Sequence, residues 1–230
     1  MPVVSAAVCP HPPLLVPEVA GGAAAELDDL RAACLAAIDP LAAADSLVIV
    51  GTGPATGTRY DASAAGSFGP YGAHSVHVGS GDAVLPLSLA VGAWLVNQSK
   101  AADLPRTSIT VAVDELPAAC LDLGRDLAHG PDRIALLVMG DGSPRRSEHS
   151  PVHLHPRAEL FDTTVAAALD LADHTTLAAL DPDLATELHA AGRAPWQVLA
   201  GATTTAALRG HLSYHAAPYG VGYFVASWTP

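Results

Sequence analysis

The chain has 230 residues, half of them hydrophobic, and a formal net charge of −12, from 11 Lys and Arg against 23 Asp and Glu. Proteins that bind the nucleic-acid backbone or anionic membranes need a basic surface, so we expect neither partner. The three cysteines show no CxxC spacing and predict reduced, buried thiols. With no basic segment leading into an apolar stretch at the start, we expect a cytoplasmic protein.

Apolar runs alternate with helical patterns along the chain. The first strand is expected over 3–8, and further buried strands over 47–50, 108–113 and 134–139. Helices are expected over 23–38, 85–96, 116–127, 157–172, 184–191 and 196–208. The aperiodic segment 51–72 is expected to be a long loop, and 210–214 and 220–227 to be strands, either as a hairpin or with one entering the core beside the first strand. This alternation predicts one α/β domain over residues 1–230, with a central mostly parallel sheet flanked by helices.

The first strand runs directly into Cys9-Pro10-His11-Pro12-Pro13. Prolines fix the backbone on both sides of His11, so the imidazole is held by a stiff loop at the carboxyl end of a strand. Ligands of α/β proteins bind at that edge of the sheet. A His in this place can be a metal ligand, a general base or a capped loop residue, and the sequence leaves these three readings open.

The chain is rich in histidine, with 11 in all. Two of them share the position of His11 relative to a strand: His149 lies in the loop after 134–139, and His215 ends the penultimate strand. We expect these imidazoles to converge on one sheet edge, where Asp141 and Ser143 would join them. Solvated loop positions without a function are expected for His129, His174 and His189.

Three stretches, in order along the chain, resemble one known family. These stretches are Cys9-Pro10-His11-Pro12-Pro13-Leu14-Leu15-Val16-Pro17-Glu18, then Val138-Met139-Gly140-Asp141-Gly142-Ser143 followed by Phe161-Asp162, and finally Leu212-Ser213-Tyr214-His215-Ala216-Ala217-Pro218-Tyr219-Gly220-Val221-Gly222-Tyr223. They are similar to motifs of the class III extradiol ring-cleavage dioxygenases, catalytic B-subunit (LigB-like) family. The resemblance implies the LigB-like α/β fold.

The same resemblance implies a non-haem Fe(II) held by two His and one Glu, a catechol bound to the iron, and a separate His that moves protons. His11 matches the first ligand, but Gly53 stands at the second His, His215 at the Glu, and Pro144 at the acid–base His. A site rich in His would suit Zn(II) at least as well as Fe(II).

The candidate roles follow from these matches. The expected metal ligands are His11 and His215, and His149 is the expected catalytic proton carrier or replacement ligand. The expected substrate-binding residues are Asp141, Ser143 and Glu18.

Three functions stay open at this point. The first is a divergent, metal-dependent oxidoreductase that cleaves a small aromatic, catechol-type substrate. The second is a non-catalytic homologue that keeps the cleft for a small-molecule ligand or serves as a structural partner. The third is metal-dependent hydrolysis on zinc, for which the sequence contains no motif. Because three family positions are changed, we expect catechol cleavage with added Fe(II) to be weak or absent.

Overall fold

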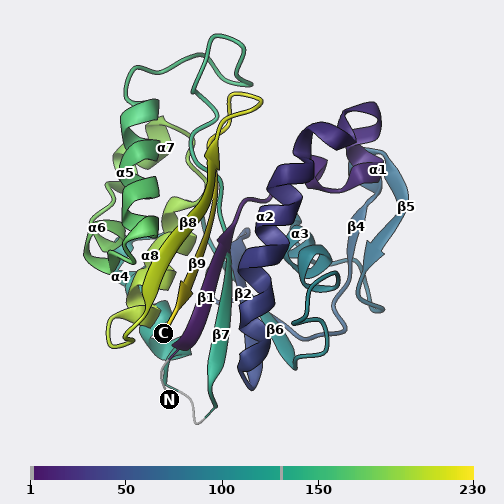
Figure 1. The fold of residues 1–230 in the computed structure, drawn as a ribbon, viewed down its shortest axis with the longest axis vertical. Coiled ribbons are helices and arrows are strands. Elements are labelled where there is room, and N and C mark those ends of the chain that lie inside the picture. The colour runs from purple at the N-terminus through teal and green to yellow at the C-terminus, as the bar shows by residue number, and fades with distance from the viewer. Residues whose placement is uncertain (1–2, 130–131) are drawn as a thin grey trace.

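The computed structural model describes residues 3–129 and 132–230. Within these ranges, a seven-stranded sheet with the order β3-β6-β2-β7-β1-β9-β8 forms the centre of the molecule (Figure 1). Its strands are β1 (Val3–Cys9), β2 (Ser46–Thr52), β3 (Arg59–Tyr60), β6 (Arg106–Val111), β7 (Ile134–Met139), β8 (Arg209–Ala216) and β9 (Tyr223–Thr229). A separate two-stranded sheet holds β4 (Gly66–Phe68) and β5 (Ala73–Val78). The expected long loop 51–72 therefore contains short strands.

The four central strands of the sheet, β6, β2, β7 and β1, are parallel to one another. On one side, β9 runs antiparallel to β1, and β8 runs antiparallel to β9. As a result, β8 points in the same direction as β1. The carboxyl ends of β1, β2, β6, β7 and β8 all lie at one edge of the sheet, where β9 begins. We call this the carboxyl edge.

Helices cover both faces of the sheet (Figure 1). The α-helices are α1 (Pro17–Ala20), α2 (Asp28–Ile38), α3 (Leu87–Val96), α4 (Pro117–Leu127), α5 (Ala158–Asp170), α6 (His174–Ala178), α7 (Pro182–Glu187) and α8 (Arg193–Thr203). Short 3-10 helices are η1 (Pro13–Leu15), η2 (Gly21–Leu27), η3 (Asp39–Ala43) and η4 (Gly69–Tyr71). One core lies between the sheet and α2 and α3, and the other lies between the sheet and α4, α5 and α8. We call these the α2-side core and the α5-side core.

Local signals explain where several helices begin. Helix α4 begins at Pro117, as expected, because a proline at the first helical position sacrifices no hydrogen bond. The expected helix over 23–38 is α-helical only from Asp28, preceded by the 3-10 turns of η2. Gly21, with φ at +56°, turns the chain between α1 and the rest of η2. Two carboxylates in the first turn of α2, Asp28 and Asp29, favour the later start.

Helices α4 and α8 pack very closely through glycine. A Cβ on Gly124 would lie 2.1 Å from the carbonyl oxygen of Val198, and one on Gly201 would lie 2.2 Å from that of Leu121. The backbones therefore approach to a distance that no side chain would permit.

The helices are short relative to a lipid bilayer. Across residues 3–129 and 132–230, none combines the length and the apolar character that crossing a membrane requires.

Candidate functional site at the carboxyl edge

Strand register brings His11 and Asp141 together. Cys9 of β1 pairs with Met139 of β7, and the functional residues follow two positions later on each strand. The backbone N–H of His11 donates to Oδ1 of Asp141 at 2.8 Å, and Nδ1 of the imidazole lies 3.7 Å from the same oxygen. Asp141 is fixed in turn, because its carbonyl accepts from the N–H of Gly192 at 2.8 Å. The pair is thus held by backbone contacts from β1, β7 and the start of α8.

A cavity of about 370 Å³ opens beside this pair. Its walls are mainly apolar, and its polar groups include the His11 and Asp141 side chains and two tyrosines. The lining residues are His11, Pro12, Pro13, Leu14, Leu87, Asp141, Gly142, Pro144, Pro151, His189, Ala191, Tyr219, Val221 and Tyr223. A cavity of this size, mostly apolar with a few convergent polar groups, is typical of small-molecule sites.

Burial shapes the chemistry of the pair. His11 is only 9% exposed, and its Nδ1 has no hydrogen-bond partner within the described parts of the chain. Burial raises the pKa of Asp141, while the proximity of His11 and the hydrogen bond from its backbone oppose that rise. Burial, followed by the charge of Asp141, also raises the pKa of Tyr223, which keeps its phenol protonated. The site therefore offers an unpaired imidazole nitrogen beside a carboxylate, and such a pair can exchange a proton with a bound hydroxyl.

His189 also lines this cavity, which the sequence reasoning missed. It follows α7 and has φ at +56°, in the left-handed region where glycine is usual. Two bonds close the helix end around it: His189 N–H donates to the carbonyl of Thr186 at 3.1 Å, and Ala190 N–H donates to that of Ala185 at 2.9 Å. The hydrogen bond from the Gly192 N–H to the Asp141 carbonyl holds the turn after His189 next to the end of β7, and His189 therefore lies in the cavity wall.

Two of the expected substrate-binding residues do not line the cavity, although each lies within a few positions of a residue that does. Ser143 is fully buried, and its hydroxyl donates to the carbonyl of Leu188 at 2.7 Å, so it joins β7 to the α7–α8 turn. Glu18 is exposed in the first turn of α1, where a carboxylate is favoured. Of the three expected substrate-binding residues, the structure places only Asp141 at the cavity.

His149 is exposed in the loop between β7 and α5 and lies outside the cavity lining. Its backbone N–H donates to the hydroxyl of Ser147 at 3.3 Å. The same loop reaches the cavity through Pro144 and Pro151 instead. The loop therefore supplies apolar wall, and no imidazole, to this site.

His215 lies at the carboxyl edge, but its side chain faces the α5-side core. Its ring stacks on Phe224 at a centroid distance of 4.9 Å and an interplanar angle of 28°, and Phe224 belongs to the α5-side core. Burial, with the charge of Arg146 as the second cause, lowers the pKa of His215, and the charge of Glu159 opposes this. The expected convergence of His11 and His215 is therefore not what the structure shows, since His215 contributes nothing to the cavity lining.

The residues at the family's ligand positions do not fit an iron centre of the expected kind. At the second His position, even a Cβ on Gly53 would lie 2.4 Å from Cγ2 of Thr110, so a side chain there requires Thr110 to move. Pro144 fills the acid–base His position in the cavity wall. Within residues 3–129 and 132–230, no three His, Cys, Asp or Glu side chains are grouped closely enough to hold a metal ion.

Comparisons with known proteins bear on the fold. No protein-family model matches the chain, and a search of curated proteins also found no match. Among solved structures, an uncharacterized protein, JW3007 from Escherichia coli K12, is similar, with a TM-score of 0.52 and 14% sequence identity over 99% of this chain and 100% of that one. At this identity, the likeness supports a shared fold along the whole chain.

Proposed function

We propose that this protein is a divergent relative of the class III extradiol dioxygenases, one that keeps the ligand cleft of the LigB-like fold without the iron-binding triad. In this proposal the cleft binds a small aromatic molecule that carries a hydroxyl group. The observation that carries the proposal is the His11–Asp141 pair, buried at the wall of the 370 Å³ cavity with the imidazole Nδ1 unpartnered.

The ligand class follows from the chemistry of the lining. Prolines, Leu14 and Leu87 provide a rigid apolar wall, and Tyr219 and Tyr223 provide aromatic surface. A flat aromatic ring gains most from such walls. A phenolic hydroxyl would donate its one proton to Asp141 and accept from the Nδ1–H of His11, which satisfies the orphaned nitrogen.

Loss of the triad supports binding, rather than ordinary ring cleavage, as the main role. Iron(II) oxygenases use two imidazoles and one carboxylate on one face of the metal. Here Gly53 has no room for a ligand, and His215 stacks on Phe224 in the α5-side core. We therefore propose that Fe(II) affinity is low and that oxygen consumption with catechols is weak or absent.

A second candidate is an enzyme that uses the same pair for proton transfer. An imidazole 3.7 Å from a carboxylate needs little movement to form an acid–base pair with it. In that case His11 would take a proton from the ligand hydroxyl, and Asp141 would stabilise the resulting imidazolium.

Metal titration and oxygen uptake test the proposal against a functioning dioxygenase. Protein purified without an affinity tag is titrated with Fe(II) and, separately, with Zn(II), and oxygen consumption is then measured with catechol. We expect no tight stoichiometric binding of either metal and no oxygen uptake above that of free Fe(II). Tight binding of one Fe(II) together with catechol-dependent oxygen uptake would overturn the proposal.

A further inference from the structure

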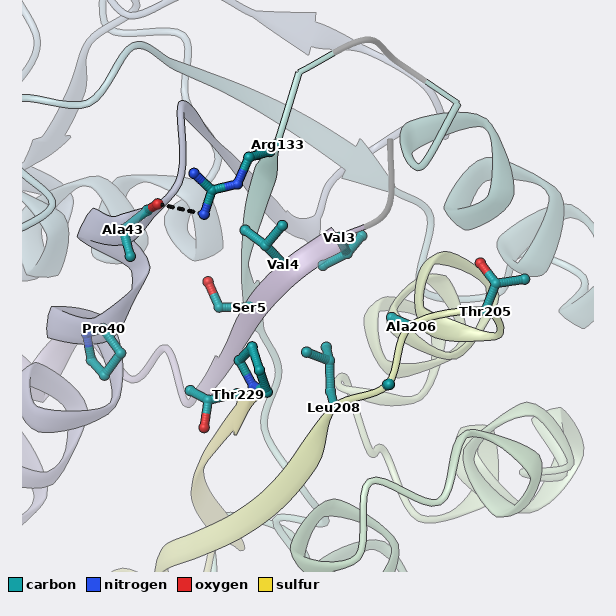
Figure 2. A pocket seen from close by; sticks show the side chains of 12 residues that line it. Val3, Val4, Ser5, Pro40, Ala43, Arg133, Thr205, Ala206, Leu208 and Thr229 are labelled. Carbon is teal, nitrogen blue, oxygen red and sulfur yellow. Dashed lines mark hydrogen bonds between the residues drawn. The ribbon is translucent and has the colours of Figure 1, made fainter.

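A second cavity, of about 640 Å³, lies at the opposite edge of the sheet from His11 (Figure 2). It is formed where β1 begins and β9 ends, between η3 and the segment that joins α8 to β8. Ser5 lies six positions before His11, and the chain between them is β1 and the residue after it, which corresponds to about 20 Å of extended chain. The cavity is therefore separate from the candidate site. Its lining residues are Val3, Val4, Ser5, Pro40, Ala43, Arg133, Thr205, Ala206, Ala207, Leu208, Thr229 and Pro230.

The Ser5 side chain is the unusual feature of this cavity. Ser5 is only 4% exposed, and its hydroxyl has no hydrogen-bond partner within the described residues. In Figure 2 its hydroxyl points away from β1, toward the side where Arg133 and Ala43 lie. The β1–β7 register shifts between Val3 and Ser5, so the strand is irregular at this point. A buried hydroxyl without a partner lowers stability, and a bound ligand atom would remove that cost.

A cationic group stands on the same cavity wall. Nη2 of Arg133 donates to the carbonyl of Ala43 at 3.1 Å, which fixes the guanidinium in place. Nη1 forms an ion pair with Oδ1 of Asp45 at 3.9 Å, which is too long for a hydrogen bond, and the backbone N–H of Arg133 donates to Oδ2 of Asp45 at 3.1 Å; Asp45 does not line the cavity. In Figure 2 the guanidinium and the Ser5 hydroxyl lie on the same side of β1. The guanidinium thus retains donors for an anion.

The rest of the cavity is apolar. The lining passes around the start of β1: Val4 and Pro40 lie on the same side of β1 as Ser5, and Val3, Leu208 and Ala206 lie on the other side (Figure 2). A ligand that matches these surfaces has one anionic head, for Ser5 and Arg133, and one hydrocarbon tail. We propose that this cavity binds a small amphipathic carboxylic acid, such as a medium-chain fatty acid, with its carboxylate at Ser5 and Arg133 and its tail on the valines and Leu208.

Isothermal titration with octanoate, below its micellar concentration, tests this site directly. We expect saturable binding at one site, with octan-1-ol and acetate binding at least about tenfold more weakly, because each lacks either the charge or the tail. Ser5→Ala and Arg133→Gln should each weaken octanoate binding by about tenfold. Ser75→Ala and Arg59→Gln, which change exposed residues of β5 and β3, should bind octanoate like the wild type.

Two further measurements keep the test decisive. The melting temperature of ligand-free Ser5→Ala should equal or exceed that of the wild type, since the change removes an unsatisfied hydroxyl; a large drop would show that Ser5 has a structural role instead. Sedimentation with phosphatidylcholine vesicles that contain oleate should leave the protein in solution. The proposal is overturned if octanoate does not bind, if both cavity variants bind it normally, or if only the vesicles bind.

Discussion

At the scale of single residues, His189 has a backbone conformation that normally belongs to glycine. Its φ of +56° completes the end of α7, and its side chain lines the carboxyl-edge cavity. Retaining a non-glycine residue in this conformation costs about 1 kcal/mol. Such a cost is often found where the side chain has a function.

Replacing His189 by glycine tests separately the backbone strain at this position and the contribution of the imidazole to ligand binding. His189→Gly should raise the free energy of unfolding by about 1 kcal/mol, measured by urea denaturation, because glycine adopts the left-handed region without strain. The same variant should bind catechol more weakly than the wild type in isothermal titration. Ala172→Gly, at the left-handed end of α5, is the matched control and should gain stability with no change in binding. Unchanged catechol binding by His189→Gly would show that the imidazole serves no ligand.

The contribution of Asp141 to the free energy of unfolding should depend on pH. Its pKa is raised by burial, so the folded state holds this proton more tightly than the unfolded state does. Stability from this group is present below the ordinary aspartate pKa of 3.8 and is lost as the pH rises through the folded-state pKa. In Asp141→Asn, the gain in unfolding free energy over the wild type should therefore grow as the pH rises above 3.8.

Asp173→Asn is the control, because its stability relative to the wild type should change with pH in the opposite direction. Hydrogen bonds from the Thr176 side chain and backbone lower the pKa of Asp173, the N-cap of α6. Its contribution is present above 3.8 and is lost as the pH falls, so this variant should lose stability relative to the wild type as the pH rises. Urea denaturation at a series of pH values measures both differences. A difference for Asp141→Asn that stays flat across this window would contradict the assigned burial.

The face of the sheet on which His215 lies could not be predicted from sequence spacing. The β8–β9 register shifts between Leu212 and Tyr214. Although these two residues are two positions apart, Leu212 packs on the α5-side core and Tyr214 on the α2-side core. Without the irregularity, alternation would place His215 on the α2 side, which the cavity adjoins. A bulge of this kind has no sequence signal here. The positions of His11 and Asp141 follow instead from regular register.

At the scale of secondary-structure elements, the tightest packing is that of α4 against α8. Gly124→Ala should lower the free energy of unfolding by at least about 2 kcal/mol, because its Cβ would meet the carbonyl of Val198 at 2.1 Å. Gly22→Ala is the matched control: its Cβ would meet no atom within 4 Å, and its stability should stay within about 0.5 kcal/mol of the wild type. Equal stabilities of the two variants, measured by thermal denaturation, would contradict the close helix approach.

Most helices and strands could be predicted from the sequence, because their apolar residues recur at helical or strand spacing. The strand over Ile134–Met139 and the start of α4 at Pro117 agree with expectation. Helix α8 was expected over 196–208 but begins at Arg193 and ends at Thr203. Arg193 is buried and donates to the carbonyls of Val113 and Glu115. A buried, paired arginine at a helix start cannot be distinguished from a loop residue by periodicity.

At the scale of the whole molecule, strand–helix alternation predicts an α/β fold with parallel central strands, and the structure confirms it. The two alternatives expected for the final pair of strands are both present: β8 and β9 pair antiparallel as a hairpin, and β9 enters the sheet beside β1. Cavities lie at both edges of the sheet: the carboxyl edge has the His11–Asp141 pair, and the opposite edge has the Ser5 hydroxyl, unpartnered within the described residues, and Arg133.

In the proposed function, His11 and Asp141 bind a hydroxylated aromatic ligand without iron. Isothermal titration of catechol, in buffer containing a metal chelator, measures this directly for the wild type, His11→Ala and His215→Ala. We predict saturable binding to the wild type, at least about tenfold weaker binding to His11→Ala, and wild-type binding to His215→Ala, whose missing ring stacks on Phe224 away from the cavity. Catechol binding that requires added Fe(II), or that is lost equally in both variants, would contradict the account.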